Sequence, residues 1–350
     1  MPFLSVSFVN YRNLQTETLD ISSKEVFFVG KNGQGKSNLL EALYYVSYGS
    51  SFRTHNDAEI IAAGQSEFSL RALYRDANAQ SCAIAVYFSG GKKRIDKNLK
   101  RLSDRKELIN TIPCVLYSHD DMDFVNGEPE KRRFFIDQTL SMYQAGYIDV
   151  MRQYKKALKN RNILLKTRTA NAQTLDAYDI LLIKYGEEII QKRKTLIFSF
   201  NRIFTHLYEE VTGIQNVYIE YAPSFFDVQK RNFDIESAAT SSGPHRDKII
   251  FRKDNDVFTK IASTGQKRTL AILLRTAQAI FYKNTCQKNP VLLMDDVLLE
   301  LDPEKRQKMI LLLPEYEQLF CTFLPGEPYE RYIHSYTKIY TIEDGKWTQN

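Results

Sequence analysis

The sequence predicts an α/β protein that contains a mixed sheet and a β-rich segment. A lobe of helices is expected to be inserted into the chain between the two parts that form this region. Three observations predict this fold class. A glycine-rich loop separates a strand pattern from a helix pattern within residues 26–46. A second apolar strand pattern, at residues 291–294, ends in two aspartates. The long segment from 130 to 208 has helical periodicity and almost no strand signal.

The first of these patterns is typical of a nucleotide-binding loop. Residues 26–29 are all apolar, and the helix expected at residues 37–46 carries its large apolar side chains on one face. The loop between them fits G-x-x-x-x-G-K-[ST], whose glycines let backbone N–H groups surround phosphate oxygens at a helix N-terminus. We therefore expect ATP to be bound by Gly30, Lys31, Asn32, Gly33, Gln34, Gly35, Lys36 and Ser37.

The side chains of the loop and of the second strand predict metal-assisted chemistry. Lys36 is expected to reach the β- and γ-phosphates, and the Ser37 hydroxyl to coordinate Mg²⁺. A buried strand would place Asp295 and Asp296 at its carboxyl end, where ligands bind in α/β sheets. We expect Asp295 to hold Mg²⁺, directly or through water, and Asp296 to orient or deprotonate the attacking water. The pattern leaves open which aspartate has which role. Lys36, Asp295 and Asp296 are the catalytic candidates.

The distance between the two motifs predicts how the chain is organised. Asp295 follows Lys36 by 259 positions, which is more than a compact nucleotide-binding domain needs. We expect the two parts of an ATPase lobe at residues 1–128 and 241–350, with a helical lobe at residues 129–240 inserted between them. Apolar residues at alternating spacings of three and four in 175–189 indicate a packed helical lobe or hairpin, since the pattern is too short for a long coiled coil.

Local patterns place the remaining elements along the chain. A hairpin turn is expected at Gly90-Gly91, and a C-terminal hairpin at 338–349 turns at Asp344-Gly345. A tight turn at 253–256 is expected to lead into residues 257–260. Helices are expected at 269–282 and from Pro303, because proline suits the first helical position. Strands or short apolar runs are expected at 3–10, 68–75, 83–88, 94–99, 112–117, 216–221, 248–251 and 319–323.

Basic residues are concentrated in two blocks of a chain whose net charge is +6. Residues 92–106 hold eight basic and two acidic side chains, and residues 152–168 hold seven basic side chains and no acid. Two such blocks suit a polyanion, although a solvated loop and a solvated helix face remain the alternatives. If the polyanion is DNA, we expect contacts from Lys92, Lys93, Arg94, Lys155, Lys156, Lys159 and Arg161.

Composition argues against several other classes of protein. No apolar run approaches the roughly 18 residues that a membrane-spanning helix needs. The N-terminus lacks the basic start and apolar core of a signal peptide. The four cysteines are scattered and have no metal-ligand spacing. We expect a cytoplasmic protein with reduced thiols and no membrane partner.

Several stretches outside the nucleotide motifs are distinctive, namely residues 8–13, 51–54, 117–137, 154–165 and 242–247. Together with residues 30–42, they resemble the ATP-binding-cassette heads of SMC-like DNA repair ATPases and, among these, the RecF family of bacterial recombination mediators. The resemblance covers the whole chain. It implies an ABC-type P-loop ATPase head with ATP and Mg²⁺ as ligands.

The resemblance also implies how such a head works. Ser263, Gly265 and Gln266 occupy the place of the family's signature sequence, which caps the γ-phosphate bound by a second protomer. Asp302 occupies the place of a residue that crosses the dimer interface. An ATP-dependent homodimer is therefore implied, together with binding to duplex or gapped DNA and partnership with RecR and RecO. The implied activity is a weak, DNA-stimulated ATPase that helps to load RecA at gaps and supports replication restart and the SOS response.

Some residues depart from the family pattern or leave alternatives open. Asp296 stands where cassette ATPases usually have glutamate, so slow turnover is expected. No histidine follows the strand at 319–323, where Thr322 is the nearest polar substitute. Lys267 and Lys248 also depart from the pattern beside the signature and the 242–247 stretch. Roles for His245 and Arg246 stay open, and the alternative function is an ABC-type ATPase subunit of a transporter or nuclease complex.

Overall fold

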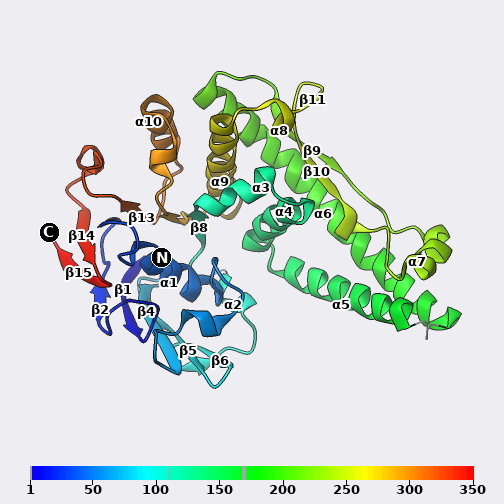
Figure 1. Cartoon of the computed structure of the whole chain (residues 1–350), viewed down its shortest axis with the longest axis horizontal. Helices are drawn as coiled ribbons and strands as arrows, with labels where there is room; N and C mark the ends of the chain where they lie inside the picture. Colours follow the sequence, from blue (N-terminus) through cyan, green and yellow to red (C-terminus); the bar gives the residue numbers. More distant parts are fainter. Residues whose placement is uncertain (1, 110, 168–170) are drawn as a thin grey trace. The chain divides into compact units, whose positions relative to one another are not determined.

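The computed structural model describes residues 2–109, 111–167 and 171–350, so that Arg168 of the second basic block lies outside the described residues. The chain divides into two compact units (Figure 1). The first unit contains the residues up to 119 and from 282 onward, and the second contains residues 120–281. No described helix is apolar over a length that could cross a lipid bilayer.

The first unit is built on a mixed sheet, as the sequence predicts, and this sheet has six strands. In spatial order the strands are β15 (Lys346–Gln349), β14 (Thr337–Glu343), β3 (Glu25–Val29), β13 (Gln318–Phe323), β12 (Val291–Met294) and β8 (Cys114–Tyr117). Five strands are parallel, and the terminal strand β15 is antiparallel to its neighbour β14. Four of the parallel strands, β3, β8, β12 and β13, are buried along their whole length, as is typical of a parallel sheet that is covered on both faces, whereas β14 is only partly buried.

A second sheet of the first unit is antiparallel and forms the predicted β-rich segment. Helix α1 (Lys36–Tyr48) contacts β4 and β5 of this sheet as well as β8, β12 and β13 of the mixed sheet. The apolar side chains of both sheets and of α1 form one continuous core. In spatial order the antiparallel strands are β2 (Thr18–Asp20), β1 (Phe3–Val9), β4 (Glu67–Arg75), β5 (Ser81–Ser89), β6 (Lys92–Lys97) and β7 (Lys100–Arg101).

The strand expected at residues 94–99 is wrong at its end. β6 stops at Lys97, and Asn98 and Leu99 have positive φ angles of 50° and 65°. They form a two-residue turn, after which Lys100 pairs with Lys97. Leu99 is 93% exposed, so its apolar side chain marks the tip of a hairpin rather than the core face of a strand. The short elements of this unit are η1 (Asp57–Ile60), α2 (Lys106–Ile109), η5 (Leu298–Glu300), α10 (Pro303–Leu311) and η6 (Tyr329–Tyr332).

The second unit is dominated by a helical hairpin of α5 (Ala145–Thr167) and α6 (Ala172–Thr212) (Figure 1). Buried residues recur every seven positions along α6, at Leu175, Leu182, Ile189 and Leu196, and they provide its packed face. The Asn171 side chain caps the start of α6, and Gly213 ends it with φ at 71°. This unit also contains α3 (Met122–Asn126), α4 (Pro129–Tyr143), α7 (Arg231–Ser237), η3 (Val228–Lys230) and η4 (Pro244–Arg246).

Residues 241–281 pack with these helices, so the compact unit continues past the boundary expected at residue 240. β10 (Lys248–Lys253) pairs with β9 (Val217–Ala222), and Gln278 Nε2 donates to Thr139 Oγ1 at 2.8 Å. Beyond the expected turn, β11 spans only Asp256–Val257 and is followed by helix α8 (Phe258–Ile261). Helix α9 spans Thr264–Cys286 and begins five residues before the expected start, because Ser263 caps it.

Candidate functional site

The glycine-rich loop joins β3 to α1 at the carboxyl end of the mixed sheet. Two of its glycines are required by geometry. A Cβ at Gly30 would lie 2.4 Å from the Ile342 carbonyl oxygen, which rules out any side chain. Gly35 has φ at 113° and lies against the Asn13 and Leu14 side chains, so it also needs the freedom of glycine.

The carbonyl groups of the loop are bound by donors of the protein. Lys36 Nζ donates to the carbonyls of Gly30 at 2.8 Å and Lys31 at 3.2 Å. The Gln34 carbonyl accepts from Gly345 N at 2.9 Å, and the Gly35 carbonyl accepts from Asn38 N at 3.0 Å. In a trans peptide the N–H points opposite to the C=O. The N–H groups of these peptides are therefore directed away from the supporting residues, as an anion-binding loop requires.

The expected carboxylates lie beside this loop. Ser37 Oγ donates to Asp295 Oδ1 at 2.8 Å, and Lys36 Nζ is 4.0 Å from Asp296 Oδ2. Thr322, at the end of β13, bonds to Asp296 Oδ1 at 2.8 Å and accepts from the Asp296 N–H at 2.8 Å. Asp296 has φ at 54°, an uncommon conformation for a residue with a side chain. The turn after β12 is thus held in one shape beside Lys36.

Burial raises the pKa of the Asp295 carboxyl, while the hydrogen bond from Ser37 lowers it and the charge of Asp296 raises it again. The negative charge of such a buried carboxylate is stabilised when a cation replaces the hydroxyl group that donates to it. Oxygen ligands from a serine and an aspartate suit Mg²⁺, which usually keeps several waters and binds phosphate oxygens as well. The residues present therefore fit a magnesium–nucleotide ligand.

Sequence reasoning missed the residues of the C-terminal hairpin turn that hold the loop through hydrogen bonds. Asp344 N donates to Gln34 Oε1 at 2.6 Å, and Gln15 N donates to the Gly345 carbonyl at 3.0 Å. The turn of the C-terminal hairpin therefore lies between the loop and the 10–15 segment. The hairpin itself could be predicted from Asp344-Gly345, but its contact with the loop has no local signal.

A buried glutamate of α1 links the nucleotide loop to two of the distinctive stretches. Glu41 accepts two hydrogen bonds from the Arg12 guanidinium, at 2.7 and 2.9 Å, and one from Ser51 Oγ at 2.5 Å. Arg53 lies 3.8 Å from Glu41 and donates to Asn38 Oδ1 at 2.7 Å. These contacts explain why residues 10–13 and 51–54 accompany the loop, and they place Arg53 beside it.

Glu327 is a further acid near the loop that the sequence patterns do not mark. Burial raises the pKa of its carboxyl, the hydrogen bond from Leu324 N lowers it, and the charge of Asp296 raises it. The Leu324 N–H donates to Glu327 Oε2 at 2.7 Å. This contact folds the glutamate back toward the end of β13.

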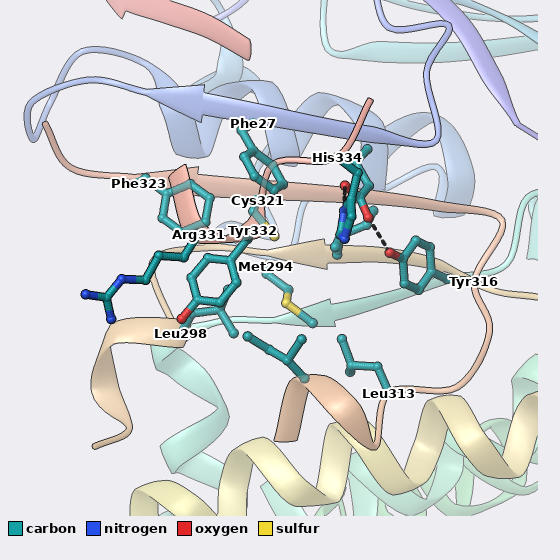
Figure 2. Close-up of a pocket in the computed structure, with 13 residues that line it drawn as sticks. Phe27, Met294, Leu298, Leu313, Tyr316, Cys321, Phe323, Arg331, Tyr332 and His334 are labelled. Carbon is teal, nitrogen blue, oxygen red and sulfur yellow. Dashed lines mark hydrogen bonds and ion pairs between the residues drawn. The ribbon is translucent and has the colours of Figure 1, made fainter. Parts of the chain in front are cut away.

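A cavity of about 220 Å³ lies on the face of the mixed sheet opposite α1 (Figure 2). Side chains of β3, β12, β13 and α10 give it an apolar lining. Its buried acid, Glu25, already accepts hydrogen bonds from Tyr316, His334 and Thr337, and the Arg331 guanidinium is directed away from the cavity (Figure 2). The cavity therefore offers no phosphate site, and the nucleotide loop is the candidate.

The expected signature residues lie at the start of α9, in the second unit, and form a capping box. Gln266 N donates to Ser263 Oγ at 3.2 Å, and Ser263 N donates to Gln266 Oε1 at 2.8 Å. A simple helix cap is therefore present. Ser263 Oγ acts as an acceptor in it, so its own hydrogen can still be donated. The exposed Ser263, Thr264 and Gly265 leave the helix N-terminus accessible to an anion.

The basic side chains expected to bind DNA differ in exposure. Lys92 is exposed, and Arg94 is 57% exposed and pairs with Asp96. Lys93 is only 22% exposed, and its ammonium group binds Asp57 at 2.7 Å and the Gly49 carbonyl at 2.9 Å. Lys155, Lys156 and Lys159 are all exposed on one side of α5. The α5 lysines are thus the more accessible basic surface.

The expectation for Arg161 is wrong, because its side chain is fully buried. It donates to Asp179 Oδ1, Asp234 Oδ2 and Thr240 Oγ1, each at 2.8 Å. The guanidinium joins α5 to α6 and to the residues around α7. Arg161 belongs to an acid-free basic stretch, but its acidic partners lie 18 and 73 positions further along the chain.

Replacing Arg161 with alanine is expected to lower the free energy of unfolding by about 3–5 kcal/mol, since it leaves the buried Asp234 without a counter-charge, whereas Asp179 still pairs with Arg231. Urea denaturation followed by circular dichroism measures this change. Lys159→Ala on the same helix serves as the exposed control and is expected to change stability by less than about 0.5 kcal/mol. Equal stabilities for the two variants would contradict the structural role of Arg161.

The family can now be assigned. The model of the RecF/RecN/SMC N terminal domain matches residues 4–348. A DNA replication and repair protein RecF from Treponema pallidum is 46% identical and is aligned over 96% of this chain and 98% of its own length. The chain belongs to the RecF family.

Other comparisons agree with this assignment. RecF from Leptospira interrogans is 32% identical over 96% of both chains. The fold matches a solved structure described as the recombination mediator protein RecF-ATP in the RecFOR pathway, with a TM-score of 0.90, 26% identity and coverage of 99% of this chain and 97% of the other. A head domain of an SMC protein bound to part of ScpA has the same fold, with a TM-score of 0.61 at 15% identity. The ABC-type ATPase head expected from the sequence is thereby confirmed.

Proposed function

We propose that this RecF-family chain is an ATP-gated, DNA-binding mediator of recombinational repair. The observation that carries the proposal is the 2.8 Å contact between Ser37 Oγ and Asp295 Oδ1, which brings both halves of a split nucleotide site together. ATP binding is supported by the fit of the loop to a triphosphate and by the ATP named for the similar RecF structure. Mg²⁺ would be held by Ser37 and Asp295, and it would neutralise negative charge on the bound phosphates.

The chain's own residues then have distinct tasks in hydrolysis. Lys36, only 4% exposed, would turn its ammonium group from the loop carbonyls to the phosphate oxygens. Asp296 would orient the attacking water or accept its proton, and Thr322 keeps that carboxylate in place. An aspartate reaches less far than a glutamate, so slow hydrolysis that acts as a switch is the expected activity.

Dimerisation is the proposed consequence of ATP binding. The capping box fixes the start of α9, leaving the Ser263 hydroxyl hydrogen and the first N–H groups of the helix as donors. An anion is favoured at such a helix end. The γ-phosphate bound by one protomer would be contacted by these donors of a second copy. Asp302 would also face that copy, although within one chain it caps α10 by accepting from Lys305 N at 3.0 Å.

DNA is the proposed partner of the dimer, in duplex or gapped form. RecR and RecO would be its protein partners, in keeping with the RecFOR pathway named for the similar structure. In that setting the chain would help to place RecA on gapped DNA, and thereby support replication restart and the SOS response. The proposal is tested by titrating labelled duplex and gapped DNA with the protein, with and without ATP, while light scattering reports its oligomeric state. DNA binding and dimer formation that are both indifferent to ATP would overturn it.

Reversing the charge of Lys155, Lys156 and Lys159 to glutamate is expected to weaken duplex binding by roughly 10- to 100-fold at about 0.1 M salt, equally for unrelated sequences. The reason is that these exposed lysines would contact phosphates and not base edges. Fluorescence anisotropy at several salt concentrations measures the loss. A matched variant that reverses Lys24, Lys288 and Lys346 in the first unit changes the net charge by the same amount. Equal DNA affinities for the two variants would contradict the proposal that the α5 lysines contact DNA.

A further inference from the structure

The loop of residues 242–247, SGPHRD, is held rigidly in the second unit, yet the proposed function gives it no task. Ser242, Gly243, Pro244 and Asp247 are buried, whereas Arg246 is exposed. Gly243 has φ at 122°, and a Cβ there would lie 2.5 Å from the Tyr154 hydroxyl. The loop therefore packs directly against α5, the helix that carries the exposed lysines.

A buried arginine fixes the end of the loop. Arg193 of α6 is 2% exposed and donates to Asp247 Oδ2 at 2.7 Å and to the Pro244 carbonyl at 2.8 Å. It also binds both carboxylate oxygens of Asp137, at 2.9 and 2.8 Å. Asp247 further accepts from Ser224 N at 2.7 Å and from the Tyr221 hydroxyl. Both carboxylates are thus paired, and the loop cannot move without breaking several buried bonds.

A histidine fixes the middle of the loop to α5. The Tyr154 hydroxyl lies 2.7 Å from His245 Nδ1, and His245 Nε2 lies 3.1 Å from the Thr240 carbonyl oxygen. A carbonyl can only accept, so Nε2 carries the proton and Nδ1 accepts from Tyr154. Burial lowers the pKa of His245 to about 4, which leaves the ring neutral at pH 7. The positive charge of the loop is therefore that of Arg246.

The Arg246 side chain has few partners, although the loop backbone that carries it is fixed. Its guanidinium has one hydrogen bond, from Nη2 to the Thr240 carbonyl at 3.4 Å, and no acidic partner within ion-pair distance among the described residues. Arg133 lies close by and donates to the Asp247 carbonyl at 3.0 Å. Tyr154 directly precedes Lys155 and Lys156 in the chain. The tyrosine–histidine bond thus brings an unpaired guanidinium to the helix that bears the lysines.

We propose that Arg246 is a phosphate contact for duplex DNA and that the 242–247 loop is the rigid support that holds its backbone against the turn of α5 that also bears Lys155 and Lys156. A guanidinium can bind phosphate through two parallel hydrogen bonds, which lysine cannot. Because the loop backbone is already ordered, binding costs only the conformational entropy of the Arg246 side chain. The inference rests on the proposed function. It deepens that function by naming the residue that fixes the position of the DNA backbone along α5.

The test uses the full chain, a fluorescein-labelled duplex of mixed sequence, and a salt series from about 50 to 200 mM. Arg246→Gln is expected to weaken binding about 5- to 10-fold and to reduce the slope of log K against log salt by about 0.9, the value for one phosphate. Arg246→Lys should restore the slope and part of the affinity. Tyr154→Phe, which removes the bond to His245, should lower affinity about 2- to 3-fold with the slope unchanged, because no charge is lost.

Three outcomes distinguish failure of the inference about Arg246 from failure of the proposed function. Wild-type affinity and slope in Arg246→Gln, while the Lys155/Lys156/Lys159 reversal still weakens binding, would overturn the inference and leave the proposed function standing. Equal slopes for Arg246→Gln and Arg246→Lys would also overturn it, since a phosphate contact depends on charge. Failure of the unaltered chain to bind duplex with or without ATP would overturn the proposed function together with the inference. Arg246 is exposed, so an unchanged melting temperature of its variants is the control for folding.

Discussion

Replacing Lys36 with alanine is expected to abolish ATP-dependent dimerisation and to weaken ATP binding by roughly 10- to 100-fold, the effect of losing a hydrogen bond to a charged group. Lys36 is buried within the loop, where its ammonium group is shared between two carbonyls and lies near Asp296. Its removal takes away the phosphate ligand and the bond that folds the loop.

Light scattering with and without ATP, together with binding of a fluorescent ATP analogue, measures both effects. Lys24→Ala is the matched control, because Lys24 is an exposed lysine that directly precedes the same strand, β3, at its other end. Lys36→Arg separates the contribution of the positive charge from that of the side-chain shape, since arginine keeps the charge but is bulkier than the lysine that the loop encloses. Dimers that persist in Lys36→Ala at saturating ATP would contradict the proposed role.

The second large effect is expected from Ser263→Arg, which should eliminate ATP-dependent dimers and change the ATP affinity of the monomer by less than about 2-fold. Ser263 is exposed at the start of α9, so a long cationic side chain there blocks close approach of a second copy. The nucleotide loop lies in the other unit of the same chain, and its hydrogen bonds do not involve Ser263.

Ser263→Arg also removes the helix cap of α9, and a control variant must separate this effect from the block to dimerisation. A missing cap costs about 1 kcal/mol, and asparagine preserves it. Ser263→Asn therefore isolates the cap from the proposed contact with phosphate, and it should remain as stable as the unaltered chain. Sedimentation velocity with ATP reports the dimer, and equilibrium dialysis reports nucleotide binding. Failure of Ser263→Arg to bind ATP would contradict the division of the site between two protomers.

The parts of the fold that sequence predicted best are those with local signals. The strand, loop and helix at 25–48 follow from apolar patterns and glycines, and so does the apolar strand that ends in Asp295. The start of α9 differs from the expected one because residues 264–268 carry no apolar periodicity, and the helix start depends instead on the pairing of Ser263 with Gln266. Local patterns identify elements but give the ends poorly.

The residues that sequence reasoning placed wrongly or missed depend on distant partners. Arg161 belongs to a basic stretch, but Asp179 and Asp234 draw it into the interior. Glu41 looks like an ordinary surface residue of a helix, and only the folded chain brings Arg12 and Ser51 to it. Burial of a charge is decided by such partners, and one sequence contains no record of which ones meet.

The support of the nucleotide loop has a consequence for how the protein is made. Residues 30–37 leave the ribosome early, but Gly30 N–H needs the Phe323 carbonyl and the Gln34 carbonyl needs Gly345 N–H. Asp295 and Asp296 also arrive late. A chain interrupted during translation therefore contains the entire glycine-rich motif without the groups that hold it in shape. We therefore expect nucleotide binding to appear only after the chain has been translated beyond Gly345, whose N–H group binds the Gln34 carbonyl.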